Sequence, residues 1–459
     1  MDVVWLILDA LSFEATPFAD EGPGNMPKLE AIAEQHGLIF TNAYAPGTAS
    51  PSSHASMFTG ELPSRSGMHE ASPYFDSDIL TIGDVLGTQR ESFIISHNPF
   101  IFNGLQRGFS RTDDLRASQY MLFEDGTDPH QFLVEHRDTP VPHRYLEFLR
   151  HGENPIRSLL NGVNYKVQSW MTDLGQQSEI SSTSVSYQYA DQMNKKMRDF
   201  LDKTERDAFV VANYMDIHPP LDASDEALQR FAPDTPREKL PIGATSPEII
   251  EQSEQGNSTI TSNAESLYNA AIWDTDQLIG PLVEELIESG TFVIVTADHG
   301  TRFTNVHPLS DRRIHVPLLI FAPDISPRIV DQSVNLRSLP ATTMARIDPE
   351  DDSFDGYDLL SVTEDQTSIT EYIYDSSPTG NSVSAFGAFD EVQYDLTGIK
   401  NDTRVNWING AFDELGDSMT ERELAEVITD LSDRGVAESR ESIKYHKETE
   451  ERLESLGYL

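Results

Sequence analysis

Three mostly apolar runs, each followed by polar residues, constrain the fold of this chain more than any other feature of its sequence. The runs lie at residues 3–8, 208–214 and 292–296. Apolar runs without alternation are typical of strands buried on both faces, as in the parallel sheets of α/β proteins. Ligands of such sheets bind beyond the carboxyl ends of the strands. We therefore predict an α/β fold with a mostly parallel central sheet flanked by helices, and a functional site where these strands end.

Carboxylate and imidazole side chains follow these three runs. Asp9 comes directly after the first run, His218 follows the second, and Asp298 and His299 follow the third. Carboxylate oxygens and imidazole nitrogens are ligands for divalent cations, so we predict that Asp9, Asp298 and His299 bind a metal ion. Taken singly, Asp9 could instead cap a turn and His218 could instead be a structural histidine. Their shared position at strand ends favours a function.

The segment at 45–60 is rich in hydroxyls and small residues and follows a predicted strand. We expect it to turn into a helix, whose first N–H groups favour an oxyanion or a metal-bound nucleophile. A strand, a turn and a helix in this order lift a nucleophile above the edge of a sheet. The residues themselves leave several candidate nucleophiles, namely Thr48, Ser50, Ser52 and Ser53.

Ser50 would complete the predicted metal site as its fourth ligand. The cation would lower the pKa of the Ser50 hydroxyl, or of a hydrate formed from it, and orient the oxygen for attack. His218, and His54 one helical turn beyond Ser50, would neutralise a bound oxyanion or protonate the leaving oxygen. The reaction that fits is hydrolysis or transfer at a tetrahedral sulfate or phosphate ester.

Three further polar residues lie near predicted strands and are candidate substrate contacts. Asn98 lies in a turn after the predicted strand at 92–96. His307 lies in the loop that follows the third apolar run, and His315 begins the next predicted strand. The sequence does not rank His307 against His315.

The order of predicted strands and helices along the sequence indicates a catalytic domain and a smaller subdomain. Residues 1–345 would form the catalytic domain, interrupted at about 111–190 by an insertion. That insertion either lies near the site and selects the substrate or is a surface excursion without function. Residues 346–459 would form a C-terminal α+β subdomain, with strands at 381–389 and 391–396 before a charged helix.

The composition limits partners and environment. The chain has 459 residues with 76 acidic and 33 basic side chains, a net charge of −43. This charge repels nucleic acid and anionic membranes, so we expect neither as a partner. A surface adapted to high salt explains the excess better than calcium binding or cationic ligands, because screening reaches about 3 Å at molar salt. The chain lacks cysteine, which excludes disulfides and thiol chemistry. With no basic leader and no membrane-spanning run, we expect a cytoplasmic protein of a halophilic host.

Several segments resemble, in order, motifs of the sulfatase branch of the alkaline-phosphatase-like superfamily. Residues 50–60, SPSSHASMFTG, resemble the signature C/S-x-P-S-R-x-x-x-x-T-G, which selects Ser50 as the nucleophile. The terminal LGYL resembles the tail of many archaeal members. The other matching segments lie at 26–30, 40–46, 212–220, 296–300, 314–320 and 355–360.

The resemblance implies an alkaline-phosphatase-like fold and a metal-dependent hydrolase of sulfate esters on a glycan or a small organic molecule. It implies one divalent ion, Ca, Mg, Mn or Zn, held by Asp9, Ser50, Asp298 and His299, with His218 contacting the substrate. In sulfatases the nucleophile is a formylglycine made from Cys or Ser. Ser50 is compatible with the Ser-type form of this modification.

The chain also departs from the sulfatase pattern. Ala10 stands where many sulfatases have a second Asp, His54 replaces the signature Arg, and the turn at 97–98 has no Lys. Imidazoles replace such permanent charges only when protonated. Two alternatives stay open. One is a phosphomonoester or phosphodiester hydrolase, or a phosphotransferase, with an unmodified Ser50; the other is a non-catalytic member that binds an anionic sugar or a protein partner.

Overall fold

The chain divides into two compact units. A computed structural model describes residues 1–20, 22–115, 123, 126–127, 132, 148, 154–163, 186–375, 392–401, 403–408, 411–412 and 418–434. The first unit comprises Met1–Ile94, Asn98–Thr112 and Ser186–Leu459, and the second comprises Ile95–His97 and Asp113–Val185. Most of the insertion expected at 111–190 lies outside the described residues. The C-terminal residues belong to the same unit as the predicted site residues.

Within the described residues, the main sheet has eight strands in the order β5-β4-β6-β1-β7-β8-β2-β9. The strands are β1 Val3–Leu8, β2 Gly37–Phe40, β4 Glu91–Ser96, β5 Arg111–Asp114, β6 Ala208–Tyr214, β7 Phe292–Thr296, β8 Leu318–Phe321 and β9 Arg328–Val330. Strand β1 pairs in parallel with β6 on one side and with β7 on the other. Strand β8 runs antiparallel to both of its neighbours, β7 and β2. The prediction of a mostly parallel sheet is confirmed.

The position of β1 in the sheet explains its apolar sequence. All of its residues from Val3 to Leu8 are buried, as expected for a central strand covered on both faces. Because β6, β1 and β7 are adjacent and parallel, their carboxyl ends lie at one edge of the sheet. The polar residues that follow the three apolar runs therefore emerge at that edge.

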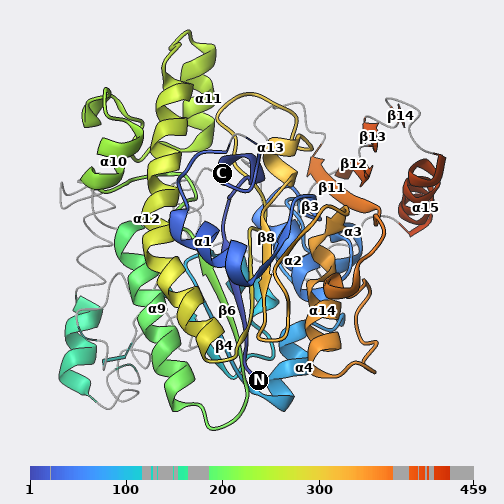
Figure 1. Ribbon diagram of the computed structural model, residues 1–459, viewed down its shortest axis with the longest axis horizontal. Helices are drawn as coiled ribbons and strands as arrows, with labels where there is room; N and C mark the ends of the chain where they lie inside the picture. The colour runs from blue at the N-terminus through green and yellow to red at the C-terminus, as the bar shows by residue number, and fades with distance from the viewer. Residues whose placement is uncertain are drawn as a thin grey trace. The chain divides into compact units, whose positions relative to one another are not determined.

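One group of helices packs around the long helix α12, which Figure 1 shows beside α1 and α9. The group comprises α1 Pro27–His36, α9 Ser186–Lys203, α10 Asp225–Phe231, α11 Ser246–Glu254 and α12 Ile260–Glu288. Helix α12 continues through Pro281, whose missing N–H leaves the carbonyl of Gln277 without its usual helical donor. The Lys28 Nζ atom of α1 donates a hydrogen bond of 3.1 Å to that carbonyl.

A second group of helices surrounds the nucleophile segment. It comprises α2 Ser50–Thr59, α3 Pro63–Ser66, α4 Ile82–Gln89 and α14 Leu339–Ile347. Every residue of α2 is buried, although the helix is rich in serine. Trp5 of β1 ties this group to the sheet, because its ring lies 6.1 Å from Phe58 and its Nε1 atom donates to Thr343 Oγ1 at 3.1 Å. The helix that carries Ser50 is therefore part of the core.

The remaining elements of the first unit include a small antiparallel sheet. Its order is β11-β12-β13-β14, and α15 packs against β12 and β13. The bounds are β11 Ser368–Asp375, β12 Val392–Lys400, β13 Thr403–Ile408, β14 Ala411–Phe412 and α15 Ser418–Arg434. The strand predicted at 391–396 forms part of β12, whereas the strand predicted at 381–389 lies outside the described residues. The expected small C-terminal sheet is confirmed.

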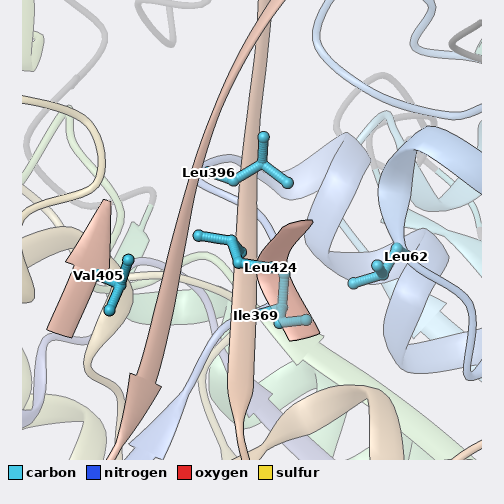
Figure 2. Close-up of a cluster of buried hydrophobic side chains, with 5 residues drawn as sticks. All are labelled: Leu62, Ile369, Leu396, Val405 and Leu424. Atoms are coloured by element: carbon cyan, nitrogen blue, oxygen red, sulfur yellow. The ribbon is translucent and has the colours of Figure 1, made fainter. Parts of the chain in front are cut away.

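A compact apolar cluster joins this small sheet to the segment after α2. Figure 2 shows Leu62, Ile369, Leu396, Val405 and Leu424, all of which are buried. Leu62 precedes α3, and the other four side chains come from β11, β12, β13 and α15. Burial of such side chains stabilises a fold by roughly 1.5–3 kcal/mol each. The cluster therefore fixes the small sheet to the helices that carry the nucleophile.

Short elements complete the described structure. They are β3 Ala43–Tyr44, which pairs with β10 Val334–Asn335, and α13 Asp311–Ile314, together with short helical turns at Phe13–Ala15, Ile101–Leu105, Arg237–Lys239, Leu336–Ser338 and Leu359–Ser361. In the part of the chain that the structure describes, no helix has the length and apolar character needed to cross a membrane.

Candidate active site

Asp9, Asp298 and His299 come together at the carboxyl ends of β1 and β7. Each offers one ligand atom, and these atoms lie within 4.8 Å of one another. All three side chains are fully buried. The sequence placed them at one edge of the sheet, and the parallel pairing of β1 with β7 brings them into one cluster.

The donor atoms of this cluster fit a divalent cation. Asp9 Oδ1 and Asp298 Oδ2 are buried and accept no hydrogen bond. The Nδ1 atom of His299 lies 2.9 Å from the carbonyl of Gly300, which places the ring proton on Nδ1 and leaves the Nε2 lone pair for a ligand. Nε2 lies 3.4 Å from Asp298 Oδ2 and 4.0 Å from Asp9 Oδ1. Two buried carboxylates at such short range are costly without a cation between them.

Burial and mutual repulsion shift the titration of these residues. Burial and the nearby charge of Asp298 raise the pKa of Asp9 well above its ordinary value. Burial lowers the pKa of His299 to about 3, so its imidazole is neutral at physiological pH. A neutral imidazole is the form that binds metal ions.

Two asparagine side chains hold the second oxygen of Asp9. Asn98 Nδ2 donates to Asp9 Oδ2 at 2.7 Å, and Asn213 Nδ2 donates to the same oxygen at 3.1 Å. These bonds leave Oδ1 directed at the metal cluster. Asn98 was expected to contact substrate, and the structure places it on Asp9. Asn213 was missed, although it is the one amide in the apolar run of β6 and this was a usable signal.

Ser50 is the first residue of α2, as the expected turn into a helix requires. Its hydroxyl lies 3.2 Å from His299 Nε2. Ala49 precedes it in extended conformation as the N-cap, and Pro51 follows within the first helical turn. Ser53 donates a hydrogen bond to the carbonyl of Asp298, which connects α2 to the end of β7. The structure thus joins Ser50 to the cluster from an independent segment.

His54 is buried directly beneath Ser50. Its Nδ1 atom lies 2.9 Å from the Ser50 carbonyl and 3.4 Å from Asp298 Oδ2. Its Nε2 atom lies 3.4 Å from Asn213 Nδ2. Burial lowers the pKa of His54, so the imidazole does not supply the permanent positive charge of the arginine it replaces. The ring connects three segments that carry site residues.

Glu70 and Arg313 support the segment around Ser50, and neither was predicted. Glu70 Oε1 accepts hydrogen bonds of 3.0 Å from the hydroxyls of Thr48 and Ser52. Burial raises the pKa of Glu70 to about 7. Arg313 donates from Nε to the Thr48 carbonyl at 2.6 Å and from Nη1 to the Gly300 carbonyl at 2.9 Å. Nothing in the local sequence signals these tertiary contacts.

Ala10 takes an unusual conformation immediately after Asp9. Its φ of 64° lies in the left-handed region, which costs roughly 1–2 kcal/mol for an L-residue with a side chain. Its N–H donates to Asp298 Oδ1 at 3.2 Å, and its carbonyl accepts from the Tyr268 hydroxyl at 2.6 Å. These bonds hold a strained turn that aims Asp9 and Asp298 at one point.

The structure places the other candidate histidines differently. The His218 ring lies 6.3 Å from the His299 ring, beside the metal cluster. His307 is exposed, and its Nε2 atom lies 3.4 Å from Asp395 Oδ2. His315 stacks between two aromatic rings, and its Nε2 atom lies 2.8 Å from the Thr41 carbonyl. His218 alone among these three has a contact with the Asp298–His299 end of β7.

The family model named Sulfatase matches residues 1–348, which is most of the chain. The chain belongs to the sulfatase family. No curated protein matches this sulfatase-family chain at a significant level.

Solved structures with the same fold share little sequence with this sulfatase-family protein. The phosphonate monoester hydrolase of Agrobacterium radiobacter is 14% identical, with a TM-score of 0.59 over 99% of this chain and 95% of that one. Ps i-CgsB in complex with k-i-k-neocarrahexaose is 13% identical, with a TM-score of 0.58 over 99% and 97%. A protein in complex with its substrate D-glucosamine-2-N,6-O-disulfate is 13% identical, with a TM-score of 0.57 over 99% and 98%. These similarities show the alkaline-phosphatase-like fold.

Proposed function

We propose that this protein hydrolyses sulfate esters, with residue 50 as the nucleophile beside a divalent metal ion. The observation that carries the proposal is the position of the Ser50 hydroxyl, 3.2 Å from His299 Nε2, on the cluster that fits a cation. A cation held by Asp9, Asp298 and His299 would supply charge neutralisation and a lowered pKa for an oxygen nucleophile.

The chain's own residues prepare the site for this reaction. The start of α2, where Ser50 is the first residue, offers the positive end of the helix dipole to an oxyanion at residue 50. Asn98 and Asn213 fix one oxygen of Asp9 and leave the other for the cation. His218, beside His299, is our candidate for the group that protonates the leaving oxygen. We assign His54 a positioning role, because its ring bonds to the backbone of Ser50.

The charge of the site favours a reacting group with one negative charge. His54 replaces the arginine of the family signature, and burial keeps its pKa low. The side chains that bond to Asp9 Oδ2 are neutral amides. The loss of permanent cations from a site weakens the binding of a dianion more than the binding of a monoanion. Sulfate monoesters are monoanionic, whereas phosphate monoesters carry two charges near neutral pH.

A phosphodiester or phosphonate monoester is the second candidate substrate. Both are monoanionic, so the charge argument admits them. An unmodified Ser50 can act as an alkoxide nucleophile, whereas a formylglycine made from it offers, once hydrated, a second hydroxyl that can expel sulfate. The modification at residue 50 therefore distinguishes the two candidates.

We propose a sulfated sugar as the substrate of the sulfatase reaction. Support comes from two proteins of the same fold, whose structures hold D-glucosamine-2-N,6-O-disulfate and k-i-k-neocarrahexaose. These ligands belong to those proteins, and at 13% identity the similarity supports the class of substrate only as a proposal.

Mass spectrometry of the peptide that contains Ser50, with assays on an aryl sulfate, a phosphate monoester and a phosphodiester, tests the proposal. Formylglycine with aryl sulfate turnover would support it. Unmodified Ser50 with phosphodiester turnover would support the second candidate. Ser50→Cys offers the other precursor of formylglycine, and Ser50→Ala is the inactive control. If no ester turns over with Mg, Ca, Mn or Zn, and Ser50→Ala still binds an anionic sugar, the protein is a non-catalytic member.

A further inference from the structure

Arg302 carries a positive charge that no described carboxylate neutralises. It lies three residues after His299 and is partly buried. Its guanidinium donates one hydrogen bond, from Nη1 to the Val306 carbonyl, and forms no ion pair within the described residues. Burial and the nearby guanidinium of Arg313 lower the pKa of Arg302. A guanidinium with unused donors in such a place is suited to bind an anion.

Two tyrosine rings of β11 stack on each other and form an aromatic surface. Tyr372 and Tyr374 are two residues apart on the strand, so they lie on the same face. Their ring centroids are 4.7 Å apart and their planes differ by 18°. Both residues are partly exposed. Stacked tyrosines offer apolar ring faces and polar hydroxyls, which suits the mixed surface of a sugar ring.

Asp395 and His307 hold this aromatic surface in place. Asp395 of β12 lies directly opposite Tyr372 in the register and accepts a hydrogen bond from Tyr374. The His307 Nε2 atom lies 3.4 Å from Asp395 Oδ2, while His307 Nδ1 accepts from the Leu309 N–H at 3.2 Å. The His307 ring meets Tyr372 edge-on at 6.2 Å. The Asp395 carboxylate therefore contacts the Tyr374 hydroxyl and the His307 ring, and these contacts hold the two tyrosine rings in position.

Hydrogen bonds and ring contacts place this surface near both Arg302 and the nucleophile segment. Arg302 donates to the carbonyl of Val306, which precedes His307 and its ring contact with Tyr372. The N–H of Glu371, next to Tyr372, donates to the Pro46 carbonyl at 3.0 Å. Burial and the charge of Glu70 raise the pKa of Tyr372 to about 12, and Arg302 opposes this shift. Glu70 in turn binds the hydroxyls of Thr48 and Ser52, on either side of Ser50. Within the first unit, the tyrosine rings therefore lie between the Arg302 guanidinium and the nucleophile segment.

We propose that Arg302 and the paired rings of Tyr372 and Tyr374 form a subsite for a second anionic group, so that the protein selects sugars with a sulfate or carboxylate beside the ester that is cleaved. The inference rests on the proposed function, since residue 50 defines which ester reacts. The rings contact the sugar, and Arg302 binds the additional anion. The site then has one position for the reacting ester and another for a charge that is retained.

Equilibrium binding to protein that carries Ser50→Ala, so that no turnover occurs, tests the subsite. The probes are glucosamine with sulfates at N2 and O6 and glucosamine with a sulfate at O6 alone. We expect the disulfated sugar to bind at least about tenfold more tightly, because the guanidinium forms charge-assisted hydrogen bonds with the second anion and these are stronger than neutral ones. Arg302→Gln should remove the preference for the disulfated sugar without weakening the binding of the monosulfated sugar. Arg302→Lys should retain part of this preference.

Two control variants accompany these. Arg328 also donates one hydrogen bond to a carbonyl, that of Leu360 at 3.0 Å, but has no described contact with the tyrosines, so Arg328→Gln should keep the preference. Tyr374→Ala should weaken the binding of both sugars to a similar extent, because stacking on the ring does not depend on the second charge. An absence of preference in the parent protein, equal weakening of both sugars by Arg302→Gln, or unchanged binding by Tyr374→Ala would each overturn the subsite.

Failure of the subsite is distinguishable from failure of the proposed function. Aryl sulfate turnover by protein with an intact Ser50, without any preference for the disulfated sugar in the binding assay, would overturn the subsite alone. A preference that disappears in Arg302→Gln, in a protein that cleaves no ester, would support the subsite and overturn the proposed reaction.

Discussion

The Nδ1 atom of His54 lies 2.9 Å from the main-chain carbonyl of Ser50, one turn earlier in the same buried helix. The same atom lies 3.4 Å from Asp298 Oδ2, so one ring connects the backbone of Ser50 to a carboxylate of the candidate metal site. This arrangement explains how an imidazole can take the place of a family arginine without taking over its charge. It makes the position of Ser50 depend on His54.

We expect His54→Ala to lower kcat about 10- to 100-fold while leaving metal binding intact, because small displacements of a nucleophile have effects of that size. The matched control is Thr59→Val, which removes a hydrogen bond of 2.7 Å from Thr59 Oγ1 to the Ala55 carbonyl in the same helix. Steady-state kinetics and thermal unfolding of both variants provide the measurement. Equal losses of kcat in the two variants would show that His54 acts only through helix stability.

The metal cluster predicts a strong dependence of stability on divalent cations. At a cation concentration one hundred times Kd, the free energy of unfolding should rise by about 2.7 kcal/mol. Asp9→Asn should lose most of this increase and should be no less stable than the parent in chelator, since one of two facing buried carboxylates is gone. Denaturant unfolding with and without cation measures both effects.

Asp276→Asn serves as the control for that experiment. The Asp276 carboxylate is also buried, but it accepts hydrogen bonds from the N–H groups of Lys28 at 3.0 Å and Leu29 at 2.9 Å. Its loss should destabilise the start of α1 and leave the response to cation unchanged. A full cation response in Asp9→Asn would contradict the assignment of Asp9 as a ligand.

The sequence predicted those parts of the fold and site that follow from local pattern and parallel topology. The run at Val3–Leu8 is apolar on both faces because β1 lies between two parallel strands, and the same reason makes Asp9 emerge beside Asp298 and His299. The segment around Ser50 was recognisable because a helix start follows the strand and turn, whereas Ser50 itself was selected by the resemblance to the family signature. Periodicity carries this information, since it reflects burial directly.

The parts that the sequence did not predict depend on contacts between distant segments. Glu70 binds hydroxyls on both sides of Ser50, and Arg302 lies near a tyrosine of β11, yet neither residue stands out locally. The left-handed turn at Ala10 is stabilised by Asp298 and Tyr268, which lie far away in the chain. Tertiary hydrogen bonds of this kind override local preference, and spacing in one sequence does not indicate them.

Glu70 should give the stability of the protein a distinct pH dependence. Its pKa is raised from 4.5 to about 7 by burial, so between these values the folded state keeps a proton that the unfolded state loses. The free energy of unfolding should therefore fall as the pH rises through this window, by at most roughly 3 kcal/mol at 1.4 kcal/mol per pH unit, and stay level above it.

Glu70→Gln isolates this effect, because glutamine keeps an oxygen that can accept from Thr48 and Ser52 but does not titrate. Urea unfolding from pH 4 to 8 gives the difference in free energy of unfolding between parent and variant. The free energy of unfolding of the parent, minus that of Glu70→Gln, should decrease as the pH rises. A flat difference would show that Glu70 titrates near its ordinary value, and a rising difference would show that its pKa is lowered in the folded state.

The small C-terminal sheet should support the nucleophile segment as well as the stability of the unit. Thr370 Oγ1 donates to the Ala45 carbonyl at 2.6 Å, and the N–H of Glu371 donates to the Pro46 carbonyl at 3.0 Å. Both acceptors lie on the segment that leads into Ser50. We expect Thr370→Val to destabilise the protein by about 1–3 kcal/mol, because a buried carbonyl loses its partner, and to lower kcat several-fold.

The control for Thr370→Val is Thr397→Val on the neighbouring strand. Thr397 is equally buried, and its hydroxyl donates to the Val405 carbonyl at 3.4 Å within the small sheet. Because this bond does not reach the nucleophile segment, Thr397→Val should reduce stability without changing kcat measured well below the unfolding temperature. If both variants lowered kcat alike, β11 would act on the site through general stability; if neither did, the segment before Ser50 would hold its position without the strand.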